Sequence, residues 1–539
     1  MHLLFLLCSS YFCFLSWSKA GLAEDWSRDI RLFWSLIIIL IFVWNKFNLI
    51  RQNYKALIPI FGFLSFFIIS QINPSYSSFD LNNLHSINFK ERITQSKSLE
   101  KINVVTNGLK LVANASQENP SRGLTIFFDF KNRYKDRFNP SEDDDLWLLI
   151  HDVETALQKP NLEFIPSVPI SDAYYYIQFY FILFHIFIGY VIFYLVIKYR
   201  NLLNYLMWVI FINCALLSLL GIVQKLNYTP SDNALEILGI WDTPEPRYFF
   251  STFTYKNHWS AFALSSLVVG FCLFYKELQF LGHEVFRSFK SMLIVLLCFP
   301  IIVSIPYSGS RSGSFLLIII ITSILISLIL KINLKRNNIV TLLYTISVLL
   351  IGFIFYSNFS KNETFIEMKK NTISQFENML QGKYPLRIYL WSDALTQCKD
   401  RIWLGHGHQG FKTLNPQYQS HHVRSERSKG LENAHNPYIP LVAHAHNDFL
   451  EWLCDFGLIG VFIFVIPYLF FLSTICLSSK STTLKLLSIS ILLIYVISLF
   501  DFPTRTPACL CLSAILHALA AGFFHHYMKR DLSLHKTSF

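Results

Sequence analysis

The chain has 539 residues, of which 53% are hydrophobic and only 15% are charged, whereas an average soluble domain has about 25% charged residues. Its mean hydropathy of +0.39 excludes a disordered chain, a basic nucleic-acid-binding domain and an ordinary cytosolic enzyme. The net charge of +11 is then expected to come from cytoplasmic loops rich in Lys and Arg, as in a polytopic membrane protein.

Twelve apolar runs predict the membrane helices, since a helix crossing a bilayer core of about 30 Å needs about 20 apolar residues. The runs lie near residues 2–17, 33–50, 57–72, 174–197, 202–223, 258–275, 291–307, 314–330, 338–356, 452–475, 485–500 and 509–527. Residues 1–20 are either a signal peptide or a retained helix. We favour the retained helix, because no Lys or Arg precedes Lys19. The sequence thus predicts an all-α polytopic membrane protein with about twelve transmembrane helices.

The short loops predict the orientation of these helices. If the twelve helices alternate, the loops rich in Lys and Arg fall on one side, which is then the cytoplasm. Two long polar segments, 73–172 and 357–446, fall on the other side. The predicted divisions are 1–72 (helices 1–3), 73–172 (periplasmic segment), 173–356 (helices 4–9), 357–446 (large periplasmic loop) and 447–539 (helices 10–12 and a cytoplasmic tail).

The first outer segment carries three consecutive acidic residues, Asp143 to Asp145, directly before a plausible amphipathic helix from Leu146 to Leu157. Such a run either binds a divalent cation or forms a solvated helix N-terminus, where the helix dipole favours negative charge. We favour the helix N-terminus.

The ten cysteines give no further framework. All except Cys398 lie in or beside apolar runs. The sequence therefore offers no spaced set for disulfides or a zinc site, and we interpret these cysteines as small hydrophobic residues packed in helices.

The second outer segment, 357–446, contains seven histidines and eleven Lys or Arg against seven Asp or Glu. A basic outer loop indicates either an anionic ligand, such as a phosphate, or a solvated loop with unused charge. Both interpretations stay open on composition alone.

Its sharpest feature lies just before the tenth predicted helix. Asp448 and Glu451 are spaced as a capping box, which predicts that the helix begins at Asp448. His446 then lies just outside a helix N-terminus, where the dipole favours a neutral imidazole that can accept a proton. Alternatively, His446 only packs or caps the start of the helix. A metal site of His444, His446 and Asp448 is a further alternative, which we disfavour because Asp448 is committed to capping.

Three further outward-facing segments have unusual chemistry for their position. The turn Ser308–Ser314 carries Arg311 among small residues before a helix, which indicates either an anion site or a structural turn. The segment Arg247–His258 mixes aromatic and basic residues, which indicates either a functional site or an aromatic belt with anchoring residues at the membrane interface. The segment Asp501–Ala508 is a Pro-punctuated outer loop.

Taken in order, these residues resemble the O-antigen ligase and polysaccharide polymerase superfamily. The matching elements are Phe253–His258, Ser310–Gly313, Arg387–Trp391 with Ala394 and Leu395, Gly405–Gly407 with Phe411, His446–Glu451 with Gly457–Gly460, and Asp501–Pro503 with Arg505–Pro507. Together they cover about residues 250–510.

The resemblance implies a GT-C-like membrane glycosyltransferase in the bacterial inner membrane, with its active site facing the periplasm. The donor it implies is a glycan linked to undecaprenyl pyrophosphate. The acceptor is lipid A-core, a growing polysaccharide or, if the chain is a protein O-oligosaccharyltransferase, a protein hydroxyl. The expected partners are these substrates and the lipid bilayer, without nucleic acid. No metal or other cofactor is expected, since ligases of this family need no divalent metal.

In the ligases of this family, a His late in the large outer loop and earlier Arg residues are essential. By motif these are His446, Arg387 and Arg311, with His446 expected as the base and the arginines on the pyrophosphate. The further candidates for substrate contacts are Lys256, Asn257, His444, Asn447 and Arg505.

The competing class is a twelve-helix polysaccharide or lipid transporter. The low glycine content, 20 of 539 residues, and the scarcity of charges within the apolar runs argue against it.

Overall fold

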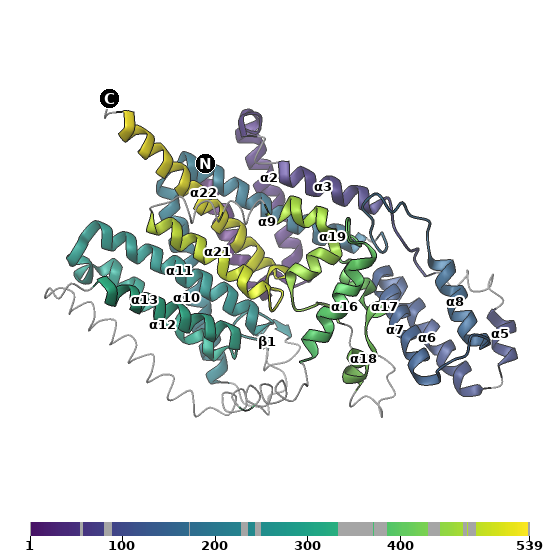
Figure 1. The fold of residues 1–539 in the computed structure, drawn as a ribbon. Helices are drawn as coiled ribbons and strands as arrows, with labels where there is room; N and C mark the ends of the chain where they lie inside the picture. The colour runs from purple at the N-terminus through teal and green to yellow at the C-terminus, as the bar shows by residue number, and fades with distance from the viewer. Residues whose placement is uncertain are drawn as a thin grey trace. The chain divides into compact units, whose positions relative to one another are not determined.

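The computed structural model describes residues 2–53, 58–79, 89–96, 98–171, 173–227, 236–242, 249–331, 370, 385–428, 442–466, 472 and 481–536. Within these residues the chain is almost entirely helical (Figure 1). The exception is a short antiparallel pair, β1 (Glu236–Ile237) and β2 (Trp241–Asp242). The chain divides into two compact units. Unit 1 comprises Met1–Leu57, Phe184–Asn378 and Phe470–Phe539, and unit 2 comprises Ile58–Leu183 and Met379–Leu469.

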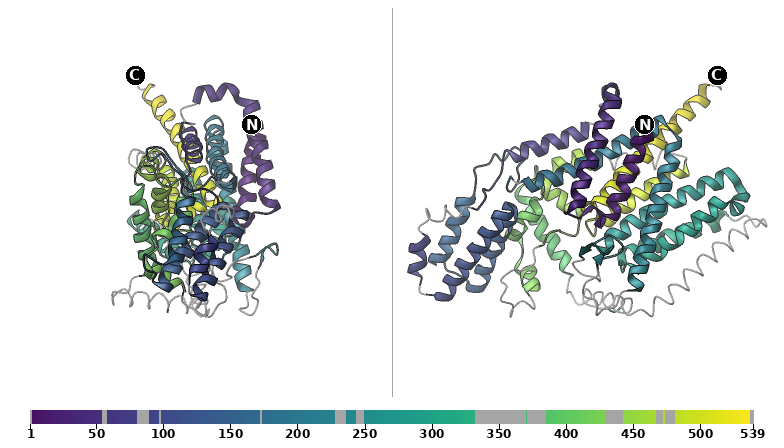
Figure 2. Two further views of the ribbon diagram at one scale, coloured as in Figure 1. Left: turned by 90° about the vertical axis from the view of Figure 1, so that its right-hand side faces the viewer. Right: turned by 180° about the vertical axis from the view of Figure 1, so that it is seen from behind.

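Unit 1 is a helical bundle built around α11. Its helices are α1 (His2–Trp17), α2 (Trp26–Asn53), the C-terminal part of α9 (Ala173–Lys198), α10 (Asn201–Leu226), α11 (Lys256–Leu281), α12 (Phe289–Tyr307), α13 (Arg311–Lys331), α21 (Thr482–Ser498) and α22 (Pro507–Lys536), with the 3₁₀ turns η1 (Lys19–Gly21), η3 (Gly282–Arg287) and η4 (Pro503–Arg505). Helix α11 packs against α10, α12 and α21. Figure 2 shows α1 and α2 lying side by side.

Small residues let the helices around α11 approach closely. The Phe211 ring of α10 occupies the space that a Cβ at Gly270 would need, 2.4 Å away. The Ser490 hydroxyl of α21 donates to the Ser265 carbonyl of α11 at 2.8 Å, and Ser266 donates within α11 to the Phe262 carbonyl. In apolar surroundings such polar groups must find partners inside the protein, so these bonds stabilise the bundle.

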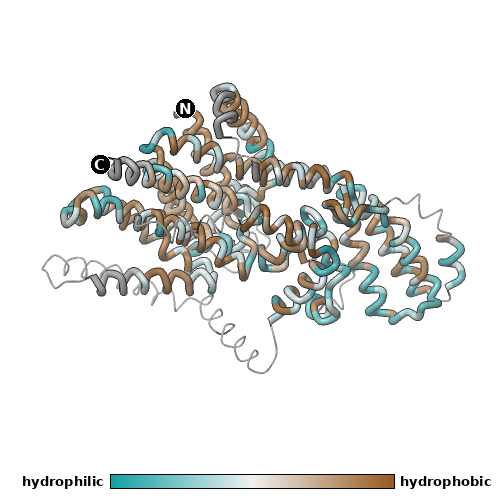
Figure 3. The backbone as a smooth tube through the Cα atoms, turned by 45° about the horizontal axis from the view of Figure 1, so that its top comes forward, coloured by the Kyte–Doolittle hydropathy of each residue, from teal (hydrophilic) through white to brown (hydrophobic). Residues whose placement is uncertain are grey.

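Five of the described helices are long and apolar enough to cross a membrane. They span Tyr176–Lys198, Asn201–Leu226, Lys256–Leu281, Phe289–Tyr307 and Pro507–Met528, with shorter apolar helices at His2–Trp17, Ile60–Gln71, Arg311–Ser323 and Thr482–Ser498. Figure 3 shows the hydrophobic colour along most helices of unit 1. The class of polytopic membrane protein is thus confirmed.

The number of twelve helices and their orientation stay predictions. Eleven of the twelve predicted runs fall on helices at least in part. The ninth run, 338–356, lies outside the described residues.

Unit 2 joins the two segments that the sequence predicts to face outward. Its helices are α3 (Ile58–Gln71), α5 (Phe89–Gln95), α6 (Leu99–Glu118), α7 (Pro120–Phe138), α8 (Asp145–Leu157), the N-terminal part of α9, α16 (Leu386–Asp400), α17 (Gly410–Tyr418), α18 (His421–Ser428) and α19 (Asp448–Phe464). Leu414 of α17 lies in the apolar core of α6, α7 and α8. Arg424 of α18 pairs with both carboxylate oxygens of Asp136 at 2.7 and 2.9 Å. Residues from both segments therefore share one core.

Helix α8 confirms the amphipathic helix predicted from Leu146 to Leu157. Asp144 is its N-cap, and its carboxylate accepts the backbone N–H groups of Leu146 and Trp147 at 3.1 and 3.3 Å. The same carboxylate pairs with Lys101 of α6. The acidic run thus starts a helix, as favoured above.

Candidate functional site

His446 lies two residues before α19, in a loop that the Glu451 side chain holds in place. Its φ of +53° is in the left-handed region, which non-glycine residues adopt rarely and mostly where the surrounding structure imposes it. The Glu451 carboxylate accepts the backbone N–H of Ala445 at 2.8 Å and lies 3.2 Å from Nδ1 of His444. Glu451 is almost fully buried, whereas His444 is about a third exposed. Glu451, in the first turn of α19, therefore keeps residues 444–446 folded against the start of the helix.

The helix begins where the sequence predicts, but the capping residue differs. Helix α19 starts at Asp448, and its N-cap is Asn447, whose side-chain oxygen accepts the N–H of Leu450 at 3.1 Å. The predicted capping box of Asp448 and Glu451 is therefore wrong, because the N-cap is Asn447, one residue before Asp448. Glu451 bonds to Ala445 instead of the N-cap, because the left-handed turn at His446 brings the Ala445 N–H within its reach.

Helix α16 connects Arg387 to the same loop. Arg387 and Trp391 are four residues apart and so lie on one face of α16. The Trp391 indole N–H donates to the carbonyl of Ala445, the residue before His446, at 3.0 Å. Unit 2 thus joins the helix of Arg387 to the loop of His446 by a hydrogen bond whose donor lies four residues from Arg387 and whose acceptor lies one residue from His446.

A break in α19 fixes this helix to the preceding loop. Gly457 has φ +64° and ψ −174° inside the helix, a conformation essentially restricted to glycine. The freed N–H groups of Leu458 and Ile459 donate to the carbonyls of Ile402 and Trp403 at 2.8 and 3.0 Å. On the other side of the break, the N–H groups of His406 and Gly407 donate to the carbonyls of Cys454 and Asp455, both at 2.7 Å.

Asp455, just before the break, caps another helix. Its carboxylate accepts the N–H groups of Gln409 and Phe411 at 3.3 and 3.0 Å, at the N-terminus of α17. A negative charge there also complements the helix dipole. The glycine-rich segment Gly405–Gly407 and the break at Gly457 therefore form one interlocked structure.

His406, one of the seven histidines of segment 357–446, has a structural role. Burial lowers the pKa of its imidazole, although the bond to the Gln397 carbonyl opposes this shift. The neutral ring donates from Nε2 to that carbonyl at 2.9 Å. Burial also raises the pKa of Asp393 on α16, which accepts from both the N–H and the hydroxyl of Ser420. The two contacts join the loop of His406 and the start of α18 to α16.

Unit 1 holds the remaining predicted site residues around one buried hydrogen-bond network. Asn257, at the start of α11, accepts from the Ser310 hydroxyl at 2.7 Å and donates to the Asp501 carboxylate. Next to it, Nδ1 of His258 lies 2.6 Å from the Thr506 hydroxyl. The network therefore connects three of the motifs that carry the family resemblance.

Three cations stand next to this network in the sequence: Lys256, Arg311 and Arg505. Lys256 and Arg311 are the first residues of α11 and α13, where the positive end of the helix dipole already favours an anion. Asp501, the carboxylate of the network, is 1% exposed. Two of the three cations thus begin helices whose first turns the Asn257–Ser310 bond joins, and Arg505 lies in the turn η4, directly before Thr506.

The predicted site residues divide between the units. Unit 2 contains Arg387, His444, His446 and Asn447, and unit 1 contains Lys256, Asn257, Arg311 and Arg505. Sequence reasoning gave no positioning role to Trp391, Ser310 or Asp501, and it expected Glu451 to cap α19 and not to accept the N–H of Ala445. All four lie inside the motifs quoted above, but their roles depend on contacts between distant parts of the chain.

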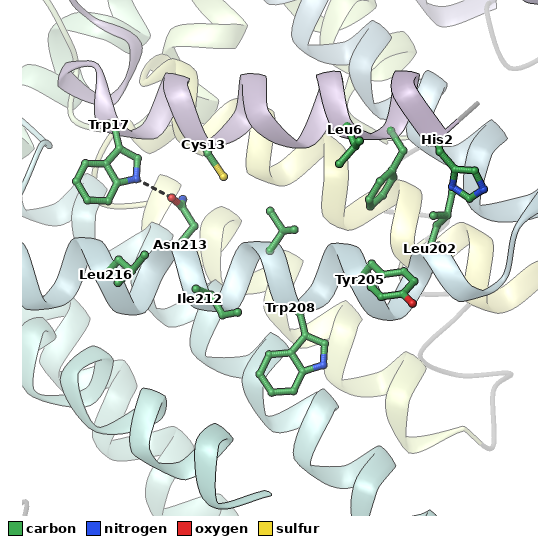
Figure 4. A pocket seen from close by; sticks show the side chains of 12 residues that line it. His2, Leu6, Cys13, Trp17, Leu202, Tyr205, Trp208, Ile212, Asn213 and Leu216 are labelled. Atoms are coloured by element: carbon green, nitrogen blue, oxygen red, sulfur yellow. Dashed lines mark hydrogen bonds between the residues drawn. The ribbon is translucent and has the colours of Figure 1, made fainter. Parts of the chain in front are cut away.

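Two other features bear on where a ligand binds. In the part of the chain that the structure describes, no three His, Cys, Asp or Glu side chains are grouped to hold a metal ion. An apolar groove of about 670 Å³ lies between α1 and α10, where Trp17 donates to Asn213 (Figure 4). Its lining contains none of the predicted site residues.

Residues 294–465, just under a third of the chain, match a family model described as O-antigen ligase. The matched region contains Arg311, Arg387 and His446, whereas Lys256 and Arg505 lie outside it. No curated protein matches the chain.

The interlock predicts that Gly457→Ala destabilises the protein strongly. A Cβ at this position would lie 2.4 Å from the carbonyl of Trp403, so the cost should be roughly 2–5 kcal/mol of unfolding free energy from strain and overpacking together. Gly282→Ala is the matched control, because Gly282 also has a positive φ but nothing lies within 4 Å of its Cβ position. Thermal unfolding of the purified protein measures both. Equal losses in the two variants would contradict the interlock.

Proposed function

We propose that this chain, a member of the O-antigen ligase superfamily by its matched residues 294–465, transfers a glycan from undecaprenyl pyrophosphate to an acceptor hydroxyl at the periplasmic face of the inner membrane. The observation that carries the proposal is the Trp391–Ala445 hydrogen bond. It joins the helix of Arg387 to the loop of His446, so the proposed anion-binding group and the proposed proton acceptor belong to one unit. The family match favours this enzyme class over a transporter.

In the proposed reaction, the acceptor hydroxyl oxygen attacks the anomeric carbon of the donor sugar. The bond from that carbon to the pyrophosphate oxygen breaks, and the lipid pyrophosphate leaves with the bonding electrons. His446 takes the proton from the attacking hydroxyl. A single displacement of this kind inverts the anomeric configuration. Glu451 and the Asn447 cap hold the loop in which the imidazole lies.

The arginines are proposed to bind the pyrophosphate. A planar guanidinium donates two parallel hydrogen bonds to phosphate oxygens, which a lysine ammonium cannot do. Arg387 supplies this group in unit 2 and Arg311 in unit 1, with Lys256 and Arg505 as further cations beside the Asn257 network. Because a pyrophosphate is a good leaving group, charge stabilisation and positioning should supply most of the rate enhancement.

The acceptor is proposed to be lipid A-core or a growing polysaccharide. A protein hydroxyl is the alternative within the same superfamily. All three present an alcohol to the same base, so the proposed chemistry is the same for each.

We expect Arg311→Ala and Arg387→Ala to abolish measurable glycan transfer while the protein still accumulates in the membrane. Lys at either position keeps the charge but loses the paired donors, so activity should fall substantially without vanishing. Arg287→Ala and Arg137→Ala are the matched controls in units 1 and 2, since both side chains form exposed ion pairs. Wild-type transfer by both Ala variants would remove the anion-binding role.

His446→Ala should lower the transfer rate about 10²–10⁴-fold, the usual contribution of a general base. Donor binding should persist, because it depends on the arginines. Transfer of a lipid-linked glycan by the purified protein, with and without EDTA, measures the rate, and the exposed His421→Ala is the control. Near-normal turnover by His446→Ala would eliminate the base. A loss of wild-type activity in EDTA that added metal restores would favour the metal site of His444, His446 and Asp448.

A further inference from the structure

Two cysteines of unit 2 meet in the interior between α16 and α19. The Sγ atoms of Cys398 and Cys454 are 2.6 Å apart although the residues are 56 positions apart in the chain. Both thiols are buried, with 2% and 0% of the residue exposed. Neither cysteine is in a disulfide in the structure. The sequence had offered no pairing for either residue, because Cys454 lies in an apolar run and Cys398 in a polar loop.

The two thiols are directed at each other by the packing of the helices. Sγ of Cys454 lies 3.2 Å from the Ala394 carbonyl of α16, and Sγ of Cys398 lies 3.8 Å from the Leu450 carbonyl of α19. Each carbonyl belongs to the residue one turn before the opposite cysteine. Non-bonded carbon atoms settle at about 3.5–4.0 Å and sulfur is larger, whereas a disulfide is about 2.05 Å long. The sulfurs are therefore closer than two thiols in simple contact.

The surroundings favour a bond between the sulfurs over a ligand site. The other members of this core cluster are apolar: Leu390, Ala394, Phe411, Val423, Val442 and Ala445. Within the described residues, no third His, Cys, Asp or Glu joins the two cysteines in a metal-binding group. Two sulfurs in contact in an apolar core have each other as the available reaction partner.

We propose that Cys398 and Cys454 form a disulfide in the mature protein, which covalently joins α16 to α19. The inference rests on the proposed function in one respect, since that function places the loop 357–446, which contains Cys398 and leads to the start of α19, on the oxidising, periplasmic side of the membrane. On that side, a thiol oxidant that carries a disulfide oxidises the two cysteines and is itself reduced to a dithiol. One cysteine thiolate attacks a sulfur of the oxidant to form a mixed disulfide, and the other cysteine displaces that sulfur. The two thiol protons pass to the oxidant, which leaves as a dithiol.

The bond would fix the two helices that hold the site in unit 2. Helix α16 carries Arg387 and Trp391 toward its start, and α19 begins directly after the His446 loop. Cys398 lies seven residues after Trp391 on α16, and Cys454 lies nine residues after Ala445, in the second turn of α19. The bond therefore acts as a positioning element and forms before the core closes over the two sulfurs.

The test counts protected cysteines in the full-length protein, made in cells with an oxidising periplasm and blocked with a thiol reagent at lysis. After denaturation without reductant, two of the ten cysteines should resist alkylation, and mass spectrometry should find the peptides of Cys398 and Cys454 linked. Cys398→Ala should leave none protected, whereas the control Cys272→Ala should leave the same two. Alkylation of all ten wild-type cysteines, or protection of a different pair, would overturn the proposal.

A double-mutant cycle provides a second measurement. If the bond exists, the first substitution already breaks it, so Cys398→Ala, Cys454→Ala and the double variant should each lower Tm by about the same amount, ~5 °C or more. Additive losses would indicate two independently packed thiols and overturn the proposal. Glycan transfer by the same wild-type preparation separates the two hypotheses. Normal transfer with ten free thiols refutes the disulfide alone, and a disulfide in a protein without transfer refutes the proposed function alone.

Discussion

The break in α19 at Gly457 is the constraint on which the rest of unit 2 depends. A helix that ran straight through this point would use the N–H groups of Leu458 and Ile459 within itself and leave none for the carbonyls of Ile402 and Trp403. Because the break lies two residues after Asp455, the same turn also presents the carboxylate that caps α17. Helix α17 in turn packs its Leu414 into the core of α6–α8. One backbone conformation therefore connects the loop of His446 to the helical bundle formed by residues 89–157.

In unit 1 the main constraint is that polar groups inside an apolar bundle need hydrogen-bond partners. Asn257, Ser310 and Asp501 come from three separate motifs and are each less than 10% exposed. Leaving any of them without its partner would cost about 1–3 kcal/mol or more, so the three motifs are held together by the requirement that all be satisfied. The same arrangement fixes the backbone positions of two cations, because Lys256 precedes Asn257 and Arg311 follows Ser310 in the chain.

Local features of the structure could be predicted from the sequence, and features that depend on contacts could not. The apolar runs, the start of α19 at Asp448 and the amphipathic helix α8 are encoded in residue periodicity and capping signals, which act over a few positions. The cap at Asn447 and the bond from Glu451 to Ala445 depend on the left-handed turn at His446, which no local signal required. The Cys398–Cys454 contact and the core that segments 73–172 and 357–446 share join residues far apart in the chain. The motifs predict the candidate site residues, and the structure shows what holds the segments that carry several of them.

The central claim is that glycan leaves a lipid pyrophosphate in a single displacement by an acceptor hydroxyl. The most direct test is to incubate the purified protein with a lipid-linked glycan and an acceptor, and to measure both products, the free lipid pyrophosphate and the glycosylated acceptor. The account predicts one lipid pyrophosphate released for each glycan transferred, and a new glycosidic bond whose anomeric configuration is opposite to that of the donor. Retention of configuration, or transfer without stoichiometric release of the lipid pyrophosphate, would contradict it.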